Sequence, residues 1–175
     1  MTKAPKRKKP ARDLPYRRGV GIALINASGK VFVAERIDTP GAWQMPQGGI
    51  DKGEKPRAAA KRELAEETGI TDAKIIATTK TWLRYDLPEN LIGKVWKGKY
   101  RGQEQKWYLM RYTGDDREID LAAHHAEFKR WKWLAFARLP KVIVGFKRDI
   151  YKQVVAAFSD QVEAVSPRAK ARRGN

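Results

Sequence analysis

The order of apolar and polar residues along the chain predicts alternating strands and helices. Residues 19–25 form a continuous apolar run of strand length, and residues 30–36 read as a second strand after a turn. The segments that follow are listed here in chain order: a helix at 55–68, strands at 73–83, 105–112 and 128–134, and an amphipathic helix at 145–158. This succession predicts an α/β domain in which a mixed β-sheet is sandwiched between α-helices.

The length and charge of the chain add two basic tails to that domain. A chain of 175 residues accounts for one domain, which we place at residues 16–160. The net charge is +17, of which residues 1–18 contribute +7 and residues 166–175 contribute +4. We therefore predict disordered basic tails over residues 1–15 and 161–175. The tails either keep the protein soluble or contact a polyanion, and the basic balance favours nucleic acid.

Composition also excludes several classes of protein. The chain contains no cysteine, so disulfides, thiol catalysis and zinc–thiolate sites are excluded. No apolar run approaches the ~18–20 residues that a membrane span requires. The basic N-terminus lacks the apolar stretch of a secretory signal. These features favour a cytoplasmic protein without a membrane partner, and none of them implies an oligomer.

The helix predicted at residues 55–68 carries a cluster of acidic residues. A proline suits its first turn, and a glycine follows its last residue. Glu63, Glu66 and Glu67 lie at positions i, i+3 and i+4, so their carboxylates share one face and repel one another. Mg²⁺ and Mn²⁺ prefer such oxygen ligands, and a bound cation would reverse the repulsion. The alternative is a solvated acidic face that forms an ion pair with Arg62.

The surroundings of this cluster favour the metal site. Residues 48–70 follow the order G-x5-E-x7-R-E-L-x-E-E-x-G-I, which resembles the signature of the Nudix hydrolases. The resemblance implies the Nudix fold and an enzyme that hydrolyses phosphoric anhydride bonds with Mg²⁺, for which Mn²⁺ or another divalent cation substitutes. It also implies that the motif loop and helix are braced by four residues: Gly48, Gly49, Glu54 and Arg62.

Further segments resemble one branch of that family. WQMPQGG at residues 43–49, WLRYDLP at 82–88 and GQEQKWY at 102–108 are similar to segments of the bacterial RNA pyrophosphohydrolases and asymmetric dinucleoside tetraphosphate hydrolases. The similarity runs from about Tyr16 to Phe158 and leaves only the tails unmatched. The long basic N-terminal extension is unusual within the branch, which bears on the choice of partner and leaves the chemistry as it is.

The branch resemblance assigns roles to individual residues. Glu63, Glu66 and Glu67 would be the main metal ligands. Glu127 would be a further ligand or a water-activating residue, so the catalytic carboxylates would be those of Glu66, Glu67 and Glu127. The substrate would be bound by five residues: Arg17, Arg36 and Lys147 on the phosphate chain, Phe146 on a base, and Tyr85 on the nucleotide. The plainer alternatives are that Phe146 belongs to the core and Arg36 to the surface.

The resulting hypothesis is a metal-dependent RNA 5′-pyrophosphohydrolase that acts in RNA decay. It would convert 5′-triphosphate ends to 5′-monophosphates and also cleave dinucleoside polyphosphates. One alternative is a dinucleoside tetraphosphate hydrolase that acts mainly on small molecules. The other is a non-catalytic RNA-binding module on a Nudix fold, which the intact acidic cluster argues against.

Overall fold

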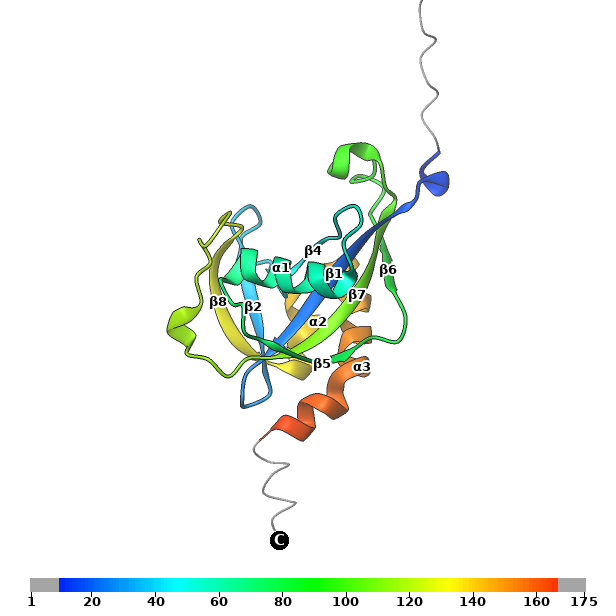
Figure 1. The fold of residues 1–175 in the computed structure, drawn as a ribbon. Coiled ribbons are helices and arrows are strands. Elements are labelled where there is room, and N and C mark those ends of the chain that lie inside the picture. The colour runs from blue at the N-terminus through cyan, green and yellow to red at the C-terminus, as the bar shows by residue number, and fades with distance from the viewer. Residues whose placement is uncertain (1–9, 167–175) are drawn as a thin grey trace, which may run out of the picture.

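The computed structural model describes residues 10–166, in which one mixed sheet lies between helices (Figure 1). The strands are β1 (Tyr16–Ile25), β2 (Lys30–Arg36), β3 (Trp43–Gln44), β4 (Gln47–Gly49), β5 (Lys74–Thr78), β6 (Leu83–Asp86), β7 (Gly102–Arg111) and β8 (Phe128–Ala135). The α-helices are α1 (Pro56–Thr68), α2 (Leu139–Val142) and α3 (Arg148–Val165). Short 3-10 helices are η1 (Ala11–Asp13), η2 (Val95–Gly98), η3 (Asp116–Glu118), η4 (Phe136–Arg138) and η5 (Gly145–Lys147).

The eight strands form a single sheet whose centre is a parallel pair. The main path runs β3-β2-β1-β7-β5, with β4 paired to β1, β6 to β7 and β8 to β2. β1 and β7 are parallel, and every other pairing is antiparallel. The predicted mixed sheet is therefore confirmed, and β1 pairs with β4, the strand that carries the two glycines at the start of the motif.

Each face of the sheet has its own apolar core, as the alternation of side chains along a strand requires. In β7, Trp107 and Leu109 face α3, whereas Tyr108 and Met110 belong to the core beneath α1. The α3 side buries a stripe of that helix, including Tyr151 and Phe158. α1 and α3 thus cover opposite faces, and the sandwich expected from the sequence is confirmed (Figure 1).

The helix α1 begins and ends where the sequence indicated. Pro56 stands at its first turn, where a missing N–H costs no hydrogen bond. Gly69 ends it in the left-handed conformation, and its N–H bonds to Ala65 O at 2.8 Å. The apolar side chains that dock α1 onto the sheet include Ala60 and Leu64. This docking leaves the Glu63 side of the helix directed toward β4.

Several predicted boundaries differ from the structure. The expected strand at 73–83 is two strands, because residues 79–82 leave the ladder after Thr79 bonds to Trp107 O. β3 and β4 were not predicted, since they have only two and three residues and flank Pro46. The closing helix continues to Val165, into the segment assigned to the C-terminal tail.

The N-terminal segment is ordered from residue 10 onward, within the range assigned to a disordered tail. Ala11–Asp13 form η1, and Arg101 Nη1 donates to Arg12 O at 3.0 Å. Residues 1–9 and 167–175 lie outside the described residues, so their predicted disorder stays a prediction. Among residues 10–166, none of the helices has the length and apolar character needed to cross a bilayer.

Candidate functional site

A cavity of about 410 Å³ opens between β1, β4, the loop after β6 and η5. It brings together every residue that the sequence analysis assigned to substrate binding: Arg17, Arg36, Tyr85, Phe146 and Lys147. Gly48, Gly49, Glu63 and Glu127 line the same cavity. Residues separated by more than a hundred positions thus converge on one pocket with an acidic side and a basic side.

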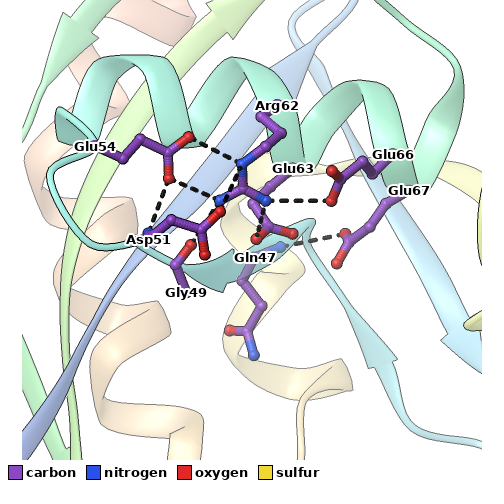
Figure 2. A network of polar contacts seen from close by, with 8 residues as sticks. All are labelled: Gln47, Gly49, Asp51, Glu54, Arg62, Glu63, Glu66 and Glu67. Atoms are coloured by element: carbon purple, nitrogen blue, oxygen red, sulfur yellow. Dashed lines mark hydrogen bonds and ion pairs between the residues drawn. The ribbon is translucent and has the colours of Figure 1, made fainter.

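Arg62 holds the motif loop against α1 (Figure 2). Its Nε and Nη2 atoms donate to the two carboxylate oxygens of Glu54, each at 2.9 Å, and Nη2 also donates to Gly49 O at 2.9 Å. Glu54 in turn accepts from Asp51 N at 3.0 Å. The hydrogen bonds from Arg62 lower the pKa of Glu54 to about 2, so this carboxylate stays charged. These contacts agree with a bracing role for Arg62 and Glu54.

The same guanidinium also occupies the space between two predicted metal ligands. Arg62 Nη1 donates to Glu63 Oε1 at 2.9 Å and to Glu66 Oε2 at 3.2 Å (Figure 2). The ion pair with Arg62, which the interpretation as a solvated acidic face predicted, is therefore present. The fully solvated face is not, because Glu67 is buried, with 4% of its surface exposed.

Glu67 and Glu63 are carboxylates held in unfavourable surroundings. Burial raises the pKa of Glu67 well above its usual range, and the charges of Glu127 and Glu63 raise it further. Its hydrogen bond from Gln47 N is long, at 3.3 Å. Burial also raises the pKa of Glu63, although Arg62 opposes the shift. Carboxylates that converge in this way are stabilised by a cation among them.

The donor set therefore fits a divalent cation, although its side chains are not arranged around one. Within residues 10–166, no three His, Cys, Asp or Glu side chains form a ready metal site. The reason is visible in Figure 2: Arg62 holds Glu63 and Glu66, while Glu67 turns to the backbone of β4. Gly48 makes room for Glu63, because a Cβ there would lie 1.9 Å from its carboxylate carbon. The backbone of β4 is thus a cradle for an acidic group.

The basic side of the pocket consists of three cationic side chains, those of Arg17, Arg36 and Lys147. Arg17 reaches Gly49, where a Cβ would lie 2.3 Å from its Nη2 atom. Arg36 donates to both oxygens of Asp38, at 2.7 and 2.6 Å, so its charge is partly compensated. Burial lowers the pKa of Lys147 to about 8, and nearby Arg36 lowers it too. A phosphate chain would satisfy all three cations at once.

Phe146 presents a ring to the pocket. It is 37% exposed, which is unusual for a large apolar side chain and sets aside the alternative that it belongs to the core. Its ring centre lies 5.9 Å from that of Tyr85, which is buried and donates from its hydroxyl to Gln103 Oε1 at 2.9 Å. Tyr85 therefore packs against Phe146, and the ring of Phe146 stays partly exposed at the cavity.

Sequence reasoning missed part of the pocket. Trp96 lines it from the loop between β6 and β7, a segment without a regular pattern. Gln103 and Gln105 were quoted only as part of a motif. Gln105 Nε2 donates to Gln47 Oε1 at 3.1 Å and so ties β7 to β4 beneath the site. The sequence did contain a signal for the loop, because a tryptophan and two lysines lie between Gly93 and Gly98. It contained no signal for the two glutamines, because the residues that they contact are distant in sequence.

Comparison with known proteins places this arrangement in context. The NUDIX domain matches residues 15–154. The chain is similar to the RNA pyrophosphohydrolase of Rhodospirillum rubrum, with 55% identity over 149 residues that cover 85% of this chain and 90% of that protein. The RNA pyrophosphohydrolase of Roseobacter denitrificans is 57% identical over 148 residues, covering 83% and 92%.

Solved structures show the same architecture. The E. coli dihydroneopterin triphosphate pyrophosphohydrolase superposes with a TM-score of 0.64 at 20% identity, covering 81% of this chain and 98% of that one. A C. elegans Ap4A hydrolase complex gives a TM-score of 0.61 at 22% identity, covering 83% and 98%. At these identities the likeness concerns the fold alone.

Proposed function

Because this chain belongs to the NUDIX family and is a pyrophosphohydrolase, we propose that it converts 5′-triphosphate ends of RNA to 5′-monophosphates, using a divalent metal ion. The observation that carries the proposal is the pocket, in which Glu63 and Glu127 face Arg17, Arg36 and Lys147 around one cavity. Relatives above 50% identity named RNA pyrophosphohydrolase support RNA as the substrate. The role in RNA decay and the cytoplasmic location belong to the same proposal.

The metal ion would be Mg²⁺, or Mn²⁺ in its place, held by Glu63, Glu66 and Glu67 with Glu127 as a further ligand. When bound, it supplies charge neutralisation for the phosphates and lowers the pKa of an attacking water. The convergence of these carboxylates supports this assignment, because the charges of Glu66 and Glu127 raise the pKa of Glu63, and those of Glu127 and Glu63 raise the pKa of Glu67. Arg62 would have to yield part of its contact with Glu63 and Glu66.

The protein residues would then bind, orient and accept a proton. Arg17, Arg36 and Lys147 would hold the phosphate chain and stabilise charge on the leaving pyrophosphate. Glu67 or Glu127 would take the proton of the water at a carboxylate oxygen. The water oxygen bonds to the α-phosphorus as the bond to the bridging oxygen breaks. The products are a 5′-monophosphate RNA, pyrophosphate and one proton, and no covalent enzyme intermediate is required.

Dinucleoside polyphosphates present the same chemistry and form the second candidate. They place a polyphosphate next to a base, so the cations and Phe146 would bind them in the same pocket. We propose that the enzyme cleaves them as well, with RNA as the main substrate. The non-catalytic RNA-binding module is disfavoured, since binding alone gives no reason to bury Glu67 among other carboxylates.

A competition assay tests the proposal. Purified protein with Mg²⁺ receives 5′-triphosphorylated RNA and diadenosine tetraphosphate together, and release from each is followed over time. Faster conversion of the RNA end is the expected result. Faster cleavage of the dinucleotide would replace the proposal with the small-molecule alternative, and binding of RNA without turnover would favour the binding module.

A variant pair shows whether turnover depends on the acidic cluster. Glu66→Gln should abolish hydrolysis and leave thermal unfolding nearly unchanged, because the Glu66 side chain is 42% exposed. Glu163→Gln is the matched control, since Glu163 is exposed on α3 and does not line the cavity. Retained activity of Glu66→Gln in a clean preparation would refute its role as a ligand.

A further inference from the structure

The loop between β6 and β7 forms a wall of the pocket without an assigned role. Leu91, Val95 and Trp96 line the cavity from this loop, whereas Phe146 and Lys147 line it from η5. Figure 1 shows the loop as a green turn that rises above the sheet near the start of β1. The pocket therefore has an aromatic residue on each of two separate elements.

The loop holds Trp96 in an unusual backbone conformation. Trp96 and Lys97 have φ angles of 48° and 57°, and no other non-glycine residue within 10–166 has a positive φ. Such a conformation is disfavoured for a residue with a Cβ, and it persists where surrounding structure holds it, often at ligand sites. Gly93 and Gly98 close the loop, because a Cβ on Gly98 would lie 3.0 Å from Gly93 O.

The indole of Trp96 is fixed beside a phosphate-binding group. The guanidinium carbon of Arg17 lies 5.4 Å from its ring centre, and the ring of Tyr100 meets it edge-on at 6.3 Å. Trp96 stays only partly buried and borders the cavity. A planar ring held in this way is a platform on which any base stacks.

The residues on both sides of Trp96 add positive charge. Residues 94–101 contain Lys94, Lys97, Lys99 and Arg101 and no acidic residue, and Arg101 forms an ion pair with Asp86 at 3.0 Å. The three lysines are exposed, and none forms an ion pair within the part of the chain that the structure describes. Arg101 donates to Arg12 O, so the loop lies against the segment that follows the basic residues 1–9.

We propose that residues 94–101 form the surface over which the RNA chain leaves the pocket. Trp96 stacks on the base of a nucleotide beyond the first, and Lys94, Lys97 and Lys99 contact the phosphodiesters that follow. This inference rests on the proposed function and goes beyond it, because it names the residues that distinguish the end of a polynucleotide from a single nucleotide. A dinucleoside polyphosphate has no phosphodiester chain for these lysines to hold.

Substrate length is the variable that tests the loop. The value of kcat/KM is measured for a nucleoside triphosphate and for 5′-triphosphorylated RNAs of two and of several nucleotides, with Mg²⁺ and at several salt concentrations. The wild-type protein should favour the longer RNAs. The readout for each variant is the ratio of kcat/KM on the long RNA to that on the nucleoside triphosphate, so a general loss of activity cancels.

Two substitutions of Trp96 separate stacking from apolar packing. Trp96→Leu keeps an apolar side chain and removes the planar ring, whereas Trp96→Phe keeps a ring. We expect Trp96→Leu to lower the length ratio by about 5- to 150-fold, the range given by the loss of one base–aromatic stack. Trp96→Phe should recover most of it. An equal loss on all substrates would mean that Trp96 is only a structural wall, and an unchanged ratio would also overturn the proposal.

The lysines are tested with a charge-matched control. Replacing Lys94, Lys97 and Lys99 by alanine should flatten the plot of log affinity against log salt for long RNA, by a slope of about 2. The control replaces Lys30, Lys74 and Lys141, which are exposed on β2, β5 and α2 and do not line the cavity. If both triple variants change the salt dependence equally, the loop lysines act only through the overall positive charge of the protein, and the proposed contact with RNA is wrong.

The wild-type protein itself distinguishes failure of this inference from failure of the proposed function. Hydrolysis of RNA of every length at one rate, with no effect of the variants, overturns only the role of the loop. Hydrolysis of diadenosine tetraphosphate without hydrolysis of any RNA overturns the proposed function, and the loop proposal with it.

Discussion

Substitution of Gly48 by alanine tests the cradle that β4 forms for Glu63. Gly48 pairs with Val20 in the sheet and is not among the glycines with positive φ, so its backbone suits an alanine. The new Cβ would lie 1.9 Å from the Glu63 carboxylate carbon and about 2 Å from both oxygens. Ordinary contact begins at 3.4 Å, so the carboxylate must retreat by about 1.5 Å.

The size of the effect follows from that displacement. A misplacement of about 1 Å in a catalytic group costs roughly 10²-fold in rate, so kcat should fall by about that factor or more. Moving Glu63 also breaks its hydrogen bond from Arg62, which has a length of 2.9 Å. A bond to a charged group is worth about 1.5–3 kcal/mol, and this is the largest loss expected in the free energy of unfolding.

The assay measures kcat on triphosphorylated RNA as a function of divalent cation concentration, together with urea unfolding. Gly53→Ala is the control: a Cβ at Gly53 meets nothing within 4 Å, but its φ of 81° strains any other residue. It should cost about 1–2 kcal/mol of stability and leave kcat nearly unchanged. The pair thus separates a displaced carboxylate from a weakened fold.

A double variant supplies the refutation. Glu63→Asp withdraws the carboxylate by one methylene, about 1.5 Å, and so vacates the space that the alanine methyl needs. Gly48→Ala should then cost far less in the Glu63→Asp background than in the wild type. Equal costs in both backgrounds, or full activity of Gly48→Ala alone, would show that Glu63 does not act from this cradle.

Three further predictions concern charge. Arg62→Ala should lower the free energy of unfolding by on the order of 3 kcal/mol, because it leaves several carboxylates without a cation. Added Mg²⁺ should restore part of the lost stability, as measured by urea denaturation. Lys61→Ala is the control, because Lys61 is exposed on α1 and its loss should leave the stability nearly unchanged. Lys147, with a pKa of about 8, loses its charge as the pH rises through that value, so KM for RNA should increase between roughly pH 7 and 9. A flat profile in the wild type, or the same increase in Lys147→Arg, would contradict this. Removal of residues 1–14 and 166–175 should weaken RNA binding and reduce its salt dependence in a titration. Unchanged affinity and salt dependence would show that the tails make no phosphate contact.

The sequence predicted best where one face of an element is buried. The apolar run at 19–25 lies within β1, and residues 30–36 are β2. Both could be predicted because such apolar residues are removed from water only when the sheet is covered. α1 could be predicted for a second reason, since its proline and its terminal glycine act locally. The mixed sheet between two layers of helices followed from these elements together.

The rest of the site depends on contacts that no local pattern reports. β4 is held by β1 and by Gln105, which is remote in sequence, and its three residues carry no periodicity. The burial of Glu67 could not be foreseen, because an acidic residue on a charged helix is ordinarily solvated. Trp96 is placed by a left-handed turn that its residue type disfavours. For each of these, tertiary structure overrides local preference.

The parallel pairing of β1 with β7 has a consequence for how the enzyme is made. Tyr16 pairs with Gly102, 86 positions later, and the register continues to Ile25 with Arg111. Contacts so distant in sequence carry a large loop-closure entropy and slow the folding of a chain. A growing chain on the ribosome therefore carries the Nudix helix long before the strand that completes the sheet beneath it has emerged. We expect catalytic competence to appear late and all at once, and N-terminal fragments that end before β7 to be both inactive and susceptible to proteases.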